Sequence, residues 1–209
     1  LAGVATAETM VRSFNTMHQA GIRLGGWANL GDSPNTKQTS GSTSYEVDFK
    51  GGAFHFEGFV DIRISPALMG ELSLGILNRG DVNLVDGADQ FFGSLLVYPF
   101  LLKAKVYPLG NTGSRLQPYI TAGGGLYYAR HDIQYYRSDA FFSGFDTQSA
   151  TSIEYTLGGG VDLPVASKIA LDLNVAYMPL RFSKDLITIR NYDGLAITLG
   201  VKYLFTSLR

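Results

Sequence analysis

Large apolar residues alternate with small or polar residues along most of this chain. Residues 194–205 show the pattern most clearly, with one set of alternate positions occupied by Leu195, Ile197, Leu199, Val201, Tyr203 and Phe205. The intervening positions carry Ala196, Thr198, Gly200 and Lys202. Alternate residues of a β-strand point to opposite faces of the sheet, so this pattern predicts a strand with one apolar and one polar face. Such a strand fits a soluble sandwich with an apolar core or a membrane barrel with a polar lumen.

The same two-faced pattern recurs in eight segments of the chain. They span residues 19–30, 53–65, 70–79, 93–107, 116–130, 151–163, 169–182 and 194–205. Tight turns that contain proline alternate with longer polar connections, as in outer-membrane barrels with periplasmic turns and extracellular loops. Strands of about 10 to 14 residues also match a tilted crossing of the bilayer. We therefore predict an all-β fold: one eight-stranded, antiparallel, up-and-down transmembrane β-barrel over residues 18–209, with periplasmic termini and long extracellular loops.

Residues 1–17 stand apart from this alternation. Ala5-Thr6-Ala7 has the small-x-small form of a signal-peptidase site. Four apolar residues then fall at helical spacing, namely Met10, Val11, Phe14 and Met17. The segment is interpreted either as the remnant of a leader or as a short periplasmic helix over residues 8–17.

Composition favours a membrane barrel and excludes several other classes. Charged residues make up only 17% of the chain, against about 25% in soluble domains. The net charge of -1 offers no basic surface for nucleic acid. Cysteine is absent, which removes disulfides and thiolate ligands. No apolar run approaches the roughly 18 residues that a transmembrane helix requires.

The charged residues gather on the polar face of the strands, and this placement identifies that face as the lumen. A soluble lipocalin-like barrel would instead be apolar inside and charged outside. Because an isolated buried charge costs several kcal/mol, the charges of the periplasmic half are predicted to pair as a plug of salt bridges. The predicted plug consists of Arg23, Asp61, Arg63, Glu71, Lys103, Lys105, Asp162, Asp172 and Lys202. Conduction of ions or protons is the alternative.

The lumen positions of the outer half are mostly large and apolar. They are Trp27, Phe59, Leu77, Leu95, Leu101, Tyr127, Met178, Leu180 and Phe182. This arrangement predicts an apolar ligand pocket that opens to the outside above a charged floor. The alternative is that these side chains simply fill the barrel.

Two short motifs resemble those of known outer-membrane proteins. Residues 198–205 resemble the terminal assembly signal, with Thr198, Gly200, Tyr203 and Phe205 at its polar, glycine and two aromatic positions. Four residues follow the terminal aromatic here, which departs from the usual pattern. Residues 116–125 are similar to the Pro-Tyr-x-x-Ala-Gly stretch of small barrels of the OmpW and OmpX/OmpA-like class. The resemblance implies insertion by the barrel assembly machinery and contact with outer-membrane lipid and lipopolysaccharide, and OmpW-like barrels are associated with passage of small hydrophobic molecules.

We therefore expect a barrel in the cell outer membrane that binds or passes small hydrophobic molecules. Such a molecule cannot cross the charged floor, so its exit is expected sideways between strands, where Pro99 and Pro179 each remove a hydrogen-bond donor. The alternative is a structural, adhesion or scaffold subunit with a plugged lumen, whose loops contact other envelope proteins. The aromatic run over residues 141–145 favours that alternative.

The sequence gives no convincing catalytic or metal site. His131 with Ser138 or Ser143 is the only plausible catalytic neighbourhood, and it lacks a His-x-Ser-Asn-like motif. The histidines and the loop aspartates also lack the spacing of a zinc or calcium site. We predict that the protein is not an enzyme and has no cofactor and no metal.

Overall fold

In the computed structural model, one N-terminal helix precedes a chain of β-strands. The structure describes residues 2–31, 38–40, 43–50, 53–86, 89–136, 143–186 and 189–206. The helix is α1 (Ala2–Thr16). The strands are β1 (His18–Asn29), β2 (Gln38–Ser40), β3 (Thr43–Lys50), β4 (Phe54–Ser65), β5 (Leu68–Asp86), β6 (Asp89–Val106), β7 (Gln117–Tyr136), β8 (Ser143–Ala166), β9 (Ile169–Met178), β10 (Arg181–Leu186), β11 (Ile189–Asn191) and β12 (Gly194–Phe205). Within the described residues, no helix is long and apolar enough to span a membrane.

Eight of these strands close into a barrel. In the order β1, β4, β5, β6, β7, β8, β9 and β12, each strand pairs antiparallel with the next. The barrel closes because β12 pairs back to β1 along its whole length, from Asn29 opposite Gly194 to His18 opposite Phe205. Closure satisfies the backbone groups of every spanning strand without water. The predicted eight-stranded antiparallel barrel is confirmed.

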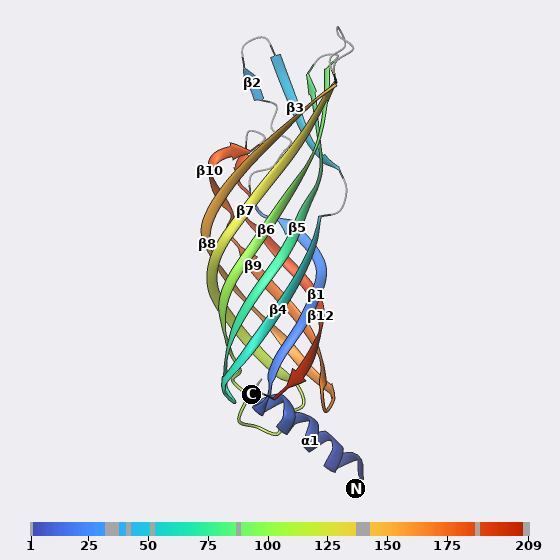
Figure 1. Cartoon of the computed structure of the whole chain (residues 1–209), viewed down its shortest axis with the longest axis vertical. Helices are drawn as coiled ribbons and strands as arrows, with labels where there is room; N and C mark the ends of the chain where they lie inside the picture. Colours follow the sequence, from blue (N-terminus) through green and yellow to red (C-terminus); the bar gives the residue numbers. More distant parts are fainter. Residues whose placement is uncertain are drawn as a thin grey trace.

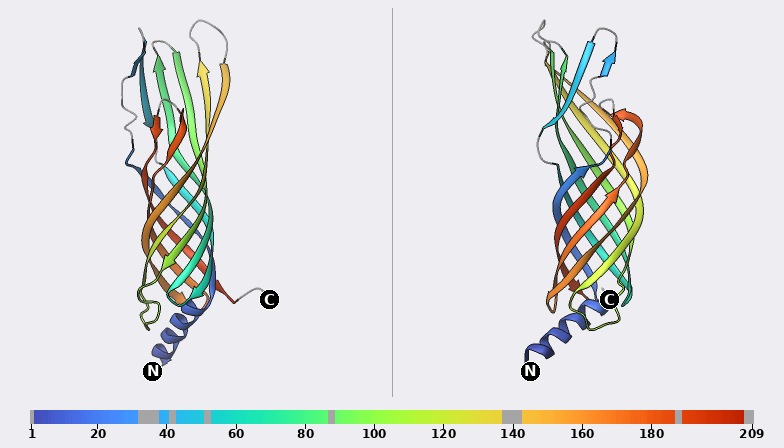
Figure 2. Two further views of the ribbon diagram at one scale, coloured as in Figure 1. Left: turned by 90° about the vertical axis from the view of Figure 1, so that its left-hand side faces the viewer. Right: turned by 180° about the vertical axis from the view of Figure 1, so that it is seen from behind.

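The two ends of the barrel differ. Both termini and the short connections lie at one end, which we call the terminal end (Figure 1). At the opposite end, the loop end, β5, β6, β7 and β8 extend well beyond their neighbours, and β2 and β3 stand beside them (Figure 2). Strand β3 adds to the extended part of β5, with Glu46 opposite Val85.

The extensions correct two loop predictions. The connection between the predicted strands 19–30 and 53–65 was expected to be a polar loop, yet it contains β2 and β3. The connection between the predicted strands 116–130 and 151–163 was also expected to be a polar loop, yet β7 continues to Tyr136 and β8 already begins opposite it, at Ser143. These segments pair through their backbones, and backbone pairing does not require the alternating apolar face that marks a strand in the sequence.

The seventh predicted strand is divided. The sequence pattern predicted one strand over residues 169–182, but β9 ends at Met178, and β10 pairs with β11 in a separate small sheet. Pro179 lies at the break, where its missing N–H cannot donate to a ladder. Asp193 stabilises the break, since its Oδ1 accepts a hydrogen bond of 3.0 Å from the backbone N–H of Leu180.

Helix α1 meets the terminal end of the barrel through its last turns. Phe14 is fully buried and packs edge-to-face on Tyr107, with 5.8 Å between ring centroids. Around this pair lie Met69, Tyr119, Ala170 and Leu204. The helix begins at Ala2 rather than at residue 8 as predicted, in keeping with the high helix propensity of the alanine-rich start.

The outer wall of the barrel is apolar, as a lipid-facing surface must be. Leu24, Leu74, Leu102 and Leu199 point outward and are well exposed, on four different strands. Each alternates with a lumen-facing neighbour, so the burial of these strands follows the period of two that the sequence shows. The chain therefore contacts membrane lipid around its middle.

Replacing Leu199 by arginine tests the lipid face. Leu199 is 69% exposed in the middle of β12, and a lipid-facing arginine near the bilayer midplane costs about 2 to 4 kcal/mol. We expect Leu199→Arg to lower the free energy of unfolding by that amount, measured by guanidinium unfolding from lipid vesicles. The control is Leu109→Arg, at a half-exposed position in the turn after β6 at the terminal end, which should leave stability nearly unchanged. Equal stability of the two variants would contradict a lipid-facing position for Leu199.

Candidate functional site: stacked charged and apolar clusters in the lumen

A network of buried ion pairs fills the lumen toward the terminal end. We call it the charged cluster, and its members are Arg23, Glu57, Asp61, Glu71, Lys103, Lys105, Asp162, Asp172 and Lys202. All nine are buried and come from seven of the eight barrel strands, every one except β7. The alternation of each strand turns these side chains inward, and barrel closure then brings them together.

Arg23 of β1 connects three acids. Its Nη1 lies 2.9 Å from Glu57 Oε1, its Nη2 lies 2.8 Å from Glu71 Oε2, and its Nε donates to Asp172 Oδ2. The register explains the first contact, because Arg23 stands directly opposite Glu57 in the β1–β4 ladder. A guanidinium offers five N–H donors in a fixed fork, which suits a residue that must satisfy several carboxylates at once.

Three lysines complete the network. Lys103 Nζ lies 2.7 Å from Glu57 Oε1 and also contacts Glu71. Lys105 Nζ lies 2.9 Å from Asp61 Oδ2 and contacts Glu71 as well. Glu71 therefore contacts three basic side chains, counting Arg23.

The third lysine, Lys202, contacts the two acids nearest to the terminal end. Its Nζ lies 2.7 Å from Asp162 Oδ1 and 3.5 Å from Asp172 Oδ1. It stands on β12, whereas Asp162 and Asp172 stand on β8 and β9. These contacts therefore join the neighbouring strands β8, β9 and β12 through their lumen-facing side chains.

Tyrosine hydroxyls support the terminal end of the charged cluster, which as a whole contains five acids and four bases. Tyr107 donates to Asp162 Oδ2 at 2.8 Å, and Tyr119 donates to Asp172 Oδ1 at 2.8 Å. Burial and the neighbouring Asp162 carboxylate raise the pKa of Tyr107, which follows β6, well above its ordinary value. Its phenol therefore stays protonated and available as a donor to the surplus negative charge.

Glu57 is a member of this cluster that the sequence analysis missed. Alternation places it in the lumen, and the signal was the run of inward positions from His55 through Glu57 and Phe59 to Asp61. The height of Glu57 along the barrel axis could not be predicted from the sequence of β4 alone. The stagger between neighbouring strands sets that height, and it places Glu57 beside Arg23.

Phe59 was predicted in the apolar pocket, and this placement is wrong. Its ring lies among the cations, with Arg23 Cζ 3.8 Å, Lys105 Nζ 4.9 Å and Lys202 Nζ 5.5 Å from the ring centroid. On β4 it stands one inward position closer to the terminal end than Glu57. A phenyl face attracts cations through its quadrupole, so Phe59 is an apolar member of the charged region.

Arg63 was predicted in the plug, and the structure places it elsewhere. Its Nη2 donates to the backbone carbonyl of Phe14 at 2.6 Å, and its Nη1 donates to that of Pro66 at 3.2 Å. It lies near the end of β4, close enough to reach the C-terminal turn of α1. A cation at a helix C-terminus is favourable, so Arg63 holds the helix against the barrel.

An apolar cluster occupies the lumen toward the loop end. It consists of Trp27, Leu77, Leu95, Val97, Leu101, Tyr127, Ala129, Ala150, Ala176, Met178, Leu180, Phe182, Tyr192 and Ala196, all buried. Every residue of the predicted pocket except Phe59 belongs to it. Tyr192, from the segment between β11 and β12, was not anticipated; its ring packs edge-to-face on Phe182 at 5.8 Å.

Three polar side chains mark the boundary between the two clusters. Trp27, His55 and Tyr127 are buried, and His55 Nε2 lies 3.7 Å from Glu57 Oε2 at the edge of the charged cluster. Trp27 and Tyr127 pack into the apolar cluster on the other side. The lumen thus changes from charged to apolar across a short polar layer.

This combination of closed barrel, apolar outer wall and polar lumen fits a known family. The profile of the family described as "Outer membrane protein beta-barrel domain" matches residues 1–205. The chain belongs to this family of outer-membrane barrels. The membrane that its strands cross is therefore an outer membrane, and the predicted likeness to small outer-membrane barrels is confirmed.

Two solved structures show the same fold. The crystal structure of the outer membrane protein OprG from Pseudomonas aeruginosa is similar with a TM-score of 0.58 and 18% identity, over 92% of this chain and 97% of that chain. The solid-state NMR structure of the outer membrane protein AlkL in DMPC bilayers is similar with a TM-score of 0.50 and 14% identity, over 93% of each chain. No curated protein sequence matches the chain.

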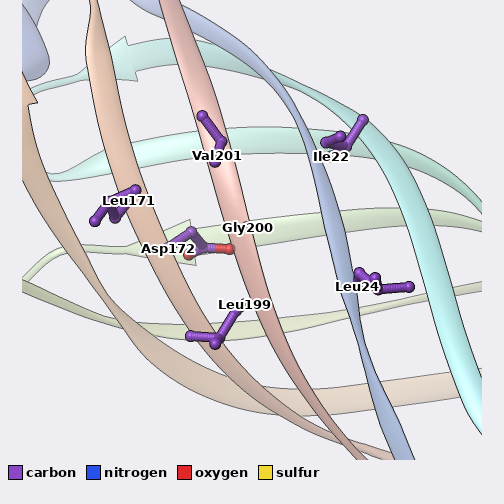
Figure 3. Close-up of a pocket in the computed structure, with 7 residues that line it drawn as sticks. All are labelled: Ile22, Leu24, Leu171, Asp172, Leu199, Gly200 and Val201. Atoms are coloured by element: carbon purple, nitrogen blue, oxygen red, sulfur yellow. The ribbon is translucent and has the colours of Figure 1, made fainter.

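A shallow groove crosses the lipid-facing wall of the barrel at its closing seam. It has a volume of about 380 Å³ and spans β9, β12 and β1 (Figure 3). Its lining residues are Ile22, Leu24, Leu171, Asp172, Leu199, Gly200 and Val201. Apart from Asp172 and Gly200 these are aliphatic, which suits contact with lipid tails. The same strand, β12, carries all four residues of the predicted assembly signal, Thr198, Gly200, Tyr203 and Phe205.

The histidines are dispersed through the barrel. His18 accepts a hydrogen bond of 3.1 Å at Nδ1 from the backbone N–H of Arg63 near the terminal end. His131 of β7 stands opposite Gln148 of β8, five positions from Ser143, which is roughly 16 Å along a strand. Ser138 lies outside the described residues. Among the residues that the structure describes, no group of three His, Asp or Glu side chains could hold a metal ion.

Neutralising Glu71 tests the charged cluster. Glu71→Gln leaves Arg23, Lys103 and Lys105 without their shared carboxylate, and breaking a buried ion pair on one side costs about 3 to 5 kcal/mol. We expect that loss in the free energy of unfolding from lipid vesicles.

The control for this test is Glu154→Gln. Glu154 is half-buried and accepts a hydrogen bond of 2.9 Å from Ser152. Its substitution should cost less than about 1 kcal/mol. A Glu71→Gln barrel as stable as the Glu154→Gln barrel would show that the cluster is not held by these charges.

Proposed function

We propose that this barrel binds small hydrophobic molecules in its apolar cluster and releases them sideways through its wall into the membrane. The observation that carries the proposal is the stacking of the two clusters: apolar residues fill the lumen at the loop end, and the charged cluster lies directly beneath them. We infer that the loop end faces the outside of the cell and that both termini face the periplasm. The short turns at the terminal end and the long hairpins at the other support that orientation.

The charged cluster argues against passage along the barrel axis. A hydrophobic molecule that entered it would separate Arg23 and Lys103 from Glu57 and Glu71, without offering any polar group in return. Uncompensated buried charge is far more costly than the gain from burying a small apolar ligand. The cluster would thus act as a floor.

The apolar cluster would make entry of an apolar ligand from the loop end energetically favourable. Burial of an aliphatic or aromatic group contributes about 1.5 to 3 kcal/mol. A ligand among Trp27, Met178 and Phe182 would exchange contact with water for contact with these side chains. The cluster is already well packed, so entry would require some of its side chains to move aside.

Breaks in strand pairing support a sideways exit. The β5–β6 ladder pairs Leu74 with Phe100 and resumes only at Leu77 with Val97. Between these pairs lies Pro99, which points into the lumen and has no N–H to donate. The wall therefore has an interruption near the height where the charged cluster ends.

A second weak place in the wall lies between β8 and β9. Their pairing ends at Leu157 opposite Tyr177, although β8 continues along β7 toward the loop end. Pro179 follows the last residues of β9 at this point. The two prolines named from the sequence thus stand beside the two interruptions.

A charge introduced at Leu101 tests the binding proposal. Leu101 is fully buried, and its side chain belongs to the apolar cluster. We expect Leu101→Asp to abolish uptake of radiolabelled octane into proteoliposomes, because the ligand would meet a buried carboxylate. Heat-modifiable gel mobility would report whether the variant folds, and Leu101→Asn provides a neutral polar version of the same test. Leu109→Asp, in the turn at the terminal end, is the control; octane uptake that survives in folded Leu101 variants would overturn the proposal.

A scaffold or adhesion function is the second candidate, and the close packing of the apolar cluster favours it. A lumen filled by its own side chains needs no ligand, and such a barrel would act through its loops on lipopolysaccharide or other envelope proteins. The aromatic run at residues 141–145 was the sequence argument for such contacts. Residues 141 and 142 lie outside the described residues.

Deletion of residues 139–146 tests the scaffold function. If the loops recruit envelope partners, pull-down from native membranes should lose those partners after the deletion, while uptake of octane stays unchanged. The full-length barrel serves as the control. Partners that are identical with and without residues 139–146 would count against this function.

A further inference from the structure

Strand β10 forms part of the wall at the loop end without being joined to the barrel by a strand ladder. It follows β9 and stands beside β8, where Ser152 Oγ donates a hydrogen bond of 2.8 Å to the carbonyl oxygen of Arg181 (Figure 1). Within the described residues, β10 pairs with β11 and with no strand of the barrel. The ladder between β8 and β9 ends nearer to the terminal end, at Leu157 opposite Tyr177. Side-chain contacts rather than backbone pairing therefore close the wall above that pair.

One side of β10 belongs to the proposed ligand cavity. Leu180, just before the strand, and Phe182 within it are buried in the apolar cluster. Tyr192, which follows β11, packs edge-to-face on Phe182 with 5.8 Å between ring centroids. Arg181, between Leu180 and Phe182, is exposed. Strand β10 therefore separates the apolar cluster from the surroundings of the barrel, and its movement away from β8 would open the cluster from the side.

Asp193 fixes the start of β10 to the barrel. Its Oδ1 accepts a hydrogen bond of 3.0 Å from the backbone N–H of Leu180, and its Oδ2 accepts one of 3.1 Å from the hydroxyl of Tyr177. Its backbone carbonyl accepts hydrogen bonds of 2.8 Å from the N–H groups of Leu30 and Gly31, which follow β1. These bonds join the start of β10 to β9 and to the end of β1, and they do not depend on the contact between β10 and β8.

The contact between β10 and β8 can be broken without leaving a donor unsatisfied. Ser152 Oγ lies 2.8 Å from the carbonyl oxygen of Arg181 and 2.9 Å from Glu154 Oε1, yet a hydroxyl has a single proton to donate. That proton can bond to Glu154 when Arg181 moves away. Ser152 and Glu154 are only half-buried, although their alternation with the exposed Ile153 places both on the lumen face of β8. The lumen face of β8 is therefore partly accessible along this edge.

The outer side of the same edge faces the membrane. Ile153 and Tyr155 of β8 point outward and are well exposed. Aromatic residues on the outside of membrane barrels gather where the bilayer meets water. A molecule that leaves between β8 and β10 would therefore enter the membrane near its surface at the loop end.

We propose that residues 180–186 form a flap that gates the sideways exit. The flap moves away from β8 while its start stays attached to Asp193, withdraws Phe182 from the apolar cluster and lets a hydrophobic molecule pass into the membrane beside Ser152. This inference rests on the proposed function, since it names the gate of the same cavity.

The flap assigns the exit to one of the two interruptions of the wall. The β5–β6 ladder resumes beyond Pro99, at Leu77 opposite Val97, so that interruption is bounded by backbone pairing on both sides. The β8–β9 ladder does not resume after Leu157, because β10 has left the barrel sheet. A molecule can therefore pass beside β10 without breaking a strand ladder.

A removable cross-link between β8 and the flap tests the gate. The chain has no cysteine, so Ser152→Cys combined with Arg181→Cys introduces the only two thiols, at positions that are already in contact. We expect oxidation of this double variant to abolish uptake of radiolabelled octane into proteoliposomes, because a flap that cannot move blocks the exit. Reduction of the disulfide should restore uptake. Maleimide labelling of the unfolded protein reports how much of it is cross-linked.

Asp132→Cys combined with Thr147→Cys is the matched control. Thr147 Oγ1 donates a hydrogen bond of 2.9 Å to Asp132 Oδ1, and the two residues stand opposite each other in the β7–β8 ladder. A disulfide at this place joins two strands that are already paired. Its oxidation should leave octane uptake unchanged.

Ser152→Ala tests the same gate without a cross-link. The substitution removes the hydrogen bond between β8 and the flap, so the rate of octane uptake should rise by up to about tenfold, the effect of one neutral hydrogen bond on an equilibrium. Ser152→Thr keeps a hydroxyl at this position and should show the rate of the unsubstituted barrel.

The outcomes distinguish this inference from the proposed function. Equal uptake by the cross-linked and the reduced Ser152 and Arg181 double variant would overturn the flap and leave the binding of hydrophobic molecules intact. An equal loss of uptake on oxidation of the control pair would also count against the flap. If the disulfide does not form, an unchanged uptake rate in Ser152→Ala would overturn the flap instead. Absence of octane uptake by the unsubstituted barrel would overturn both proposals.

Discussion

Closure of the barrel is the constraint on which the other features depend. Hydrocarbon offers no hydrogen bonds, so each spanning strand must pair along both of its edges. The full pairing of β1 with β12 removes the last two edges. A closed ring of eight strands leaves an interior just wide enough for side chains, and every inward residue must then find its partners within that space.

The charged cluster follows from this confinement. Its nine ionisable side chains are buried, yet each contacts at least one opposite charge, and Arg23 and Glu71 each contact three. Buried ion pairs are weak evidence for stability when compared with an apolar core. In the function proposed above, these ion pairs form the floor below which an apolar molecule does not pass.

Two interruptions of the wall lie near the level where the interior changes from charged to apolar. Pro99 breaks the β5–β6 ladder next to His55 and Tyr127, and the β8–β9 pairing ends before Pro179. A barrel held by uninterrupted ladders could exchange molecules only through its ends. This coincidence of interrupted pairing with the edge of the charged cluster is the basis of the sideways exit proposed above.

The sequence by itself determined the fold class, the number of spanning strands and the face of each strand, because a period of two records which side of a strand meets lipid. The inward residues of the predicted plug and pocket were found in this way, from Arg23 to Lys202. The two misplaced residues, Phe59 and Arg63, were assigned to the correct face and to the wrong surroundings. The alternation does not give the height of a residue along the barrel axis, because that height depends on the stagger between strands. The surroundings of a residue near the terminal end also depend on the helix that covers that end. Only the tertiary structure set Phe59 beside Arg23, brought Arg63 to the carbonyl of Phe14, and showed that Glu57 joins the charged cluster, because those neighbours come from strands and a helix that are distant in the chain.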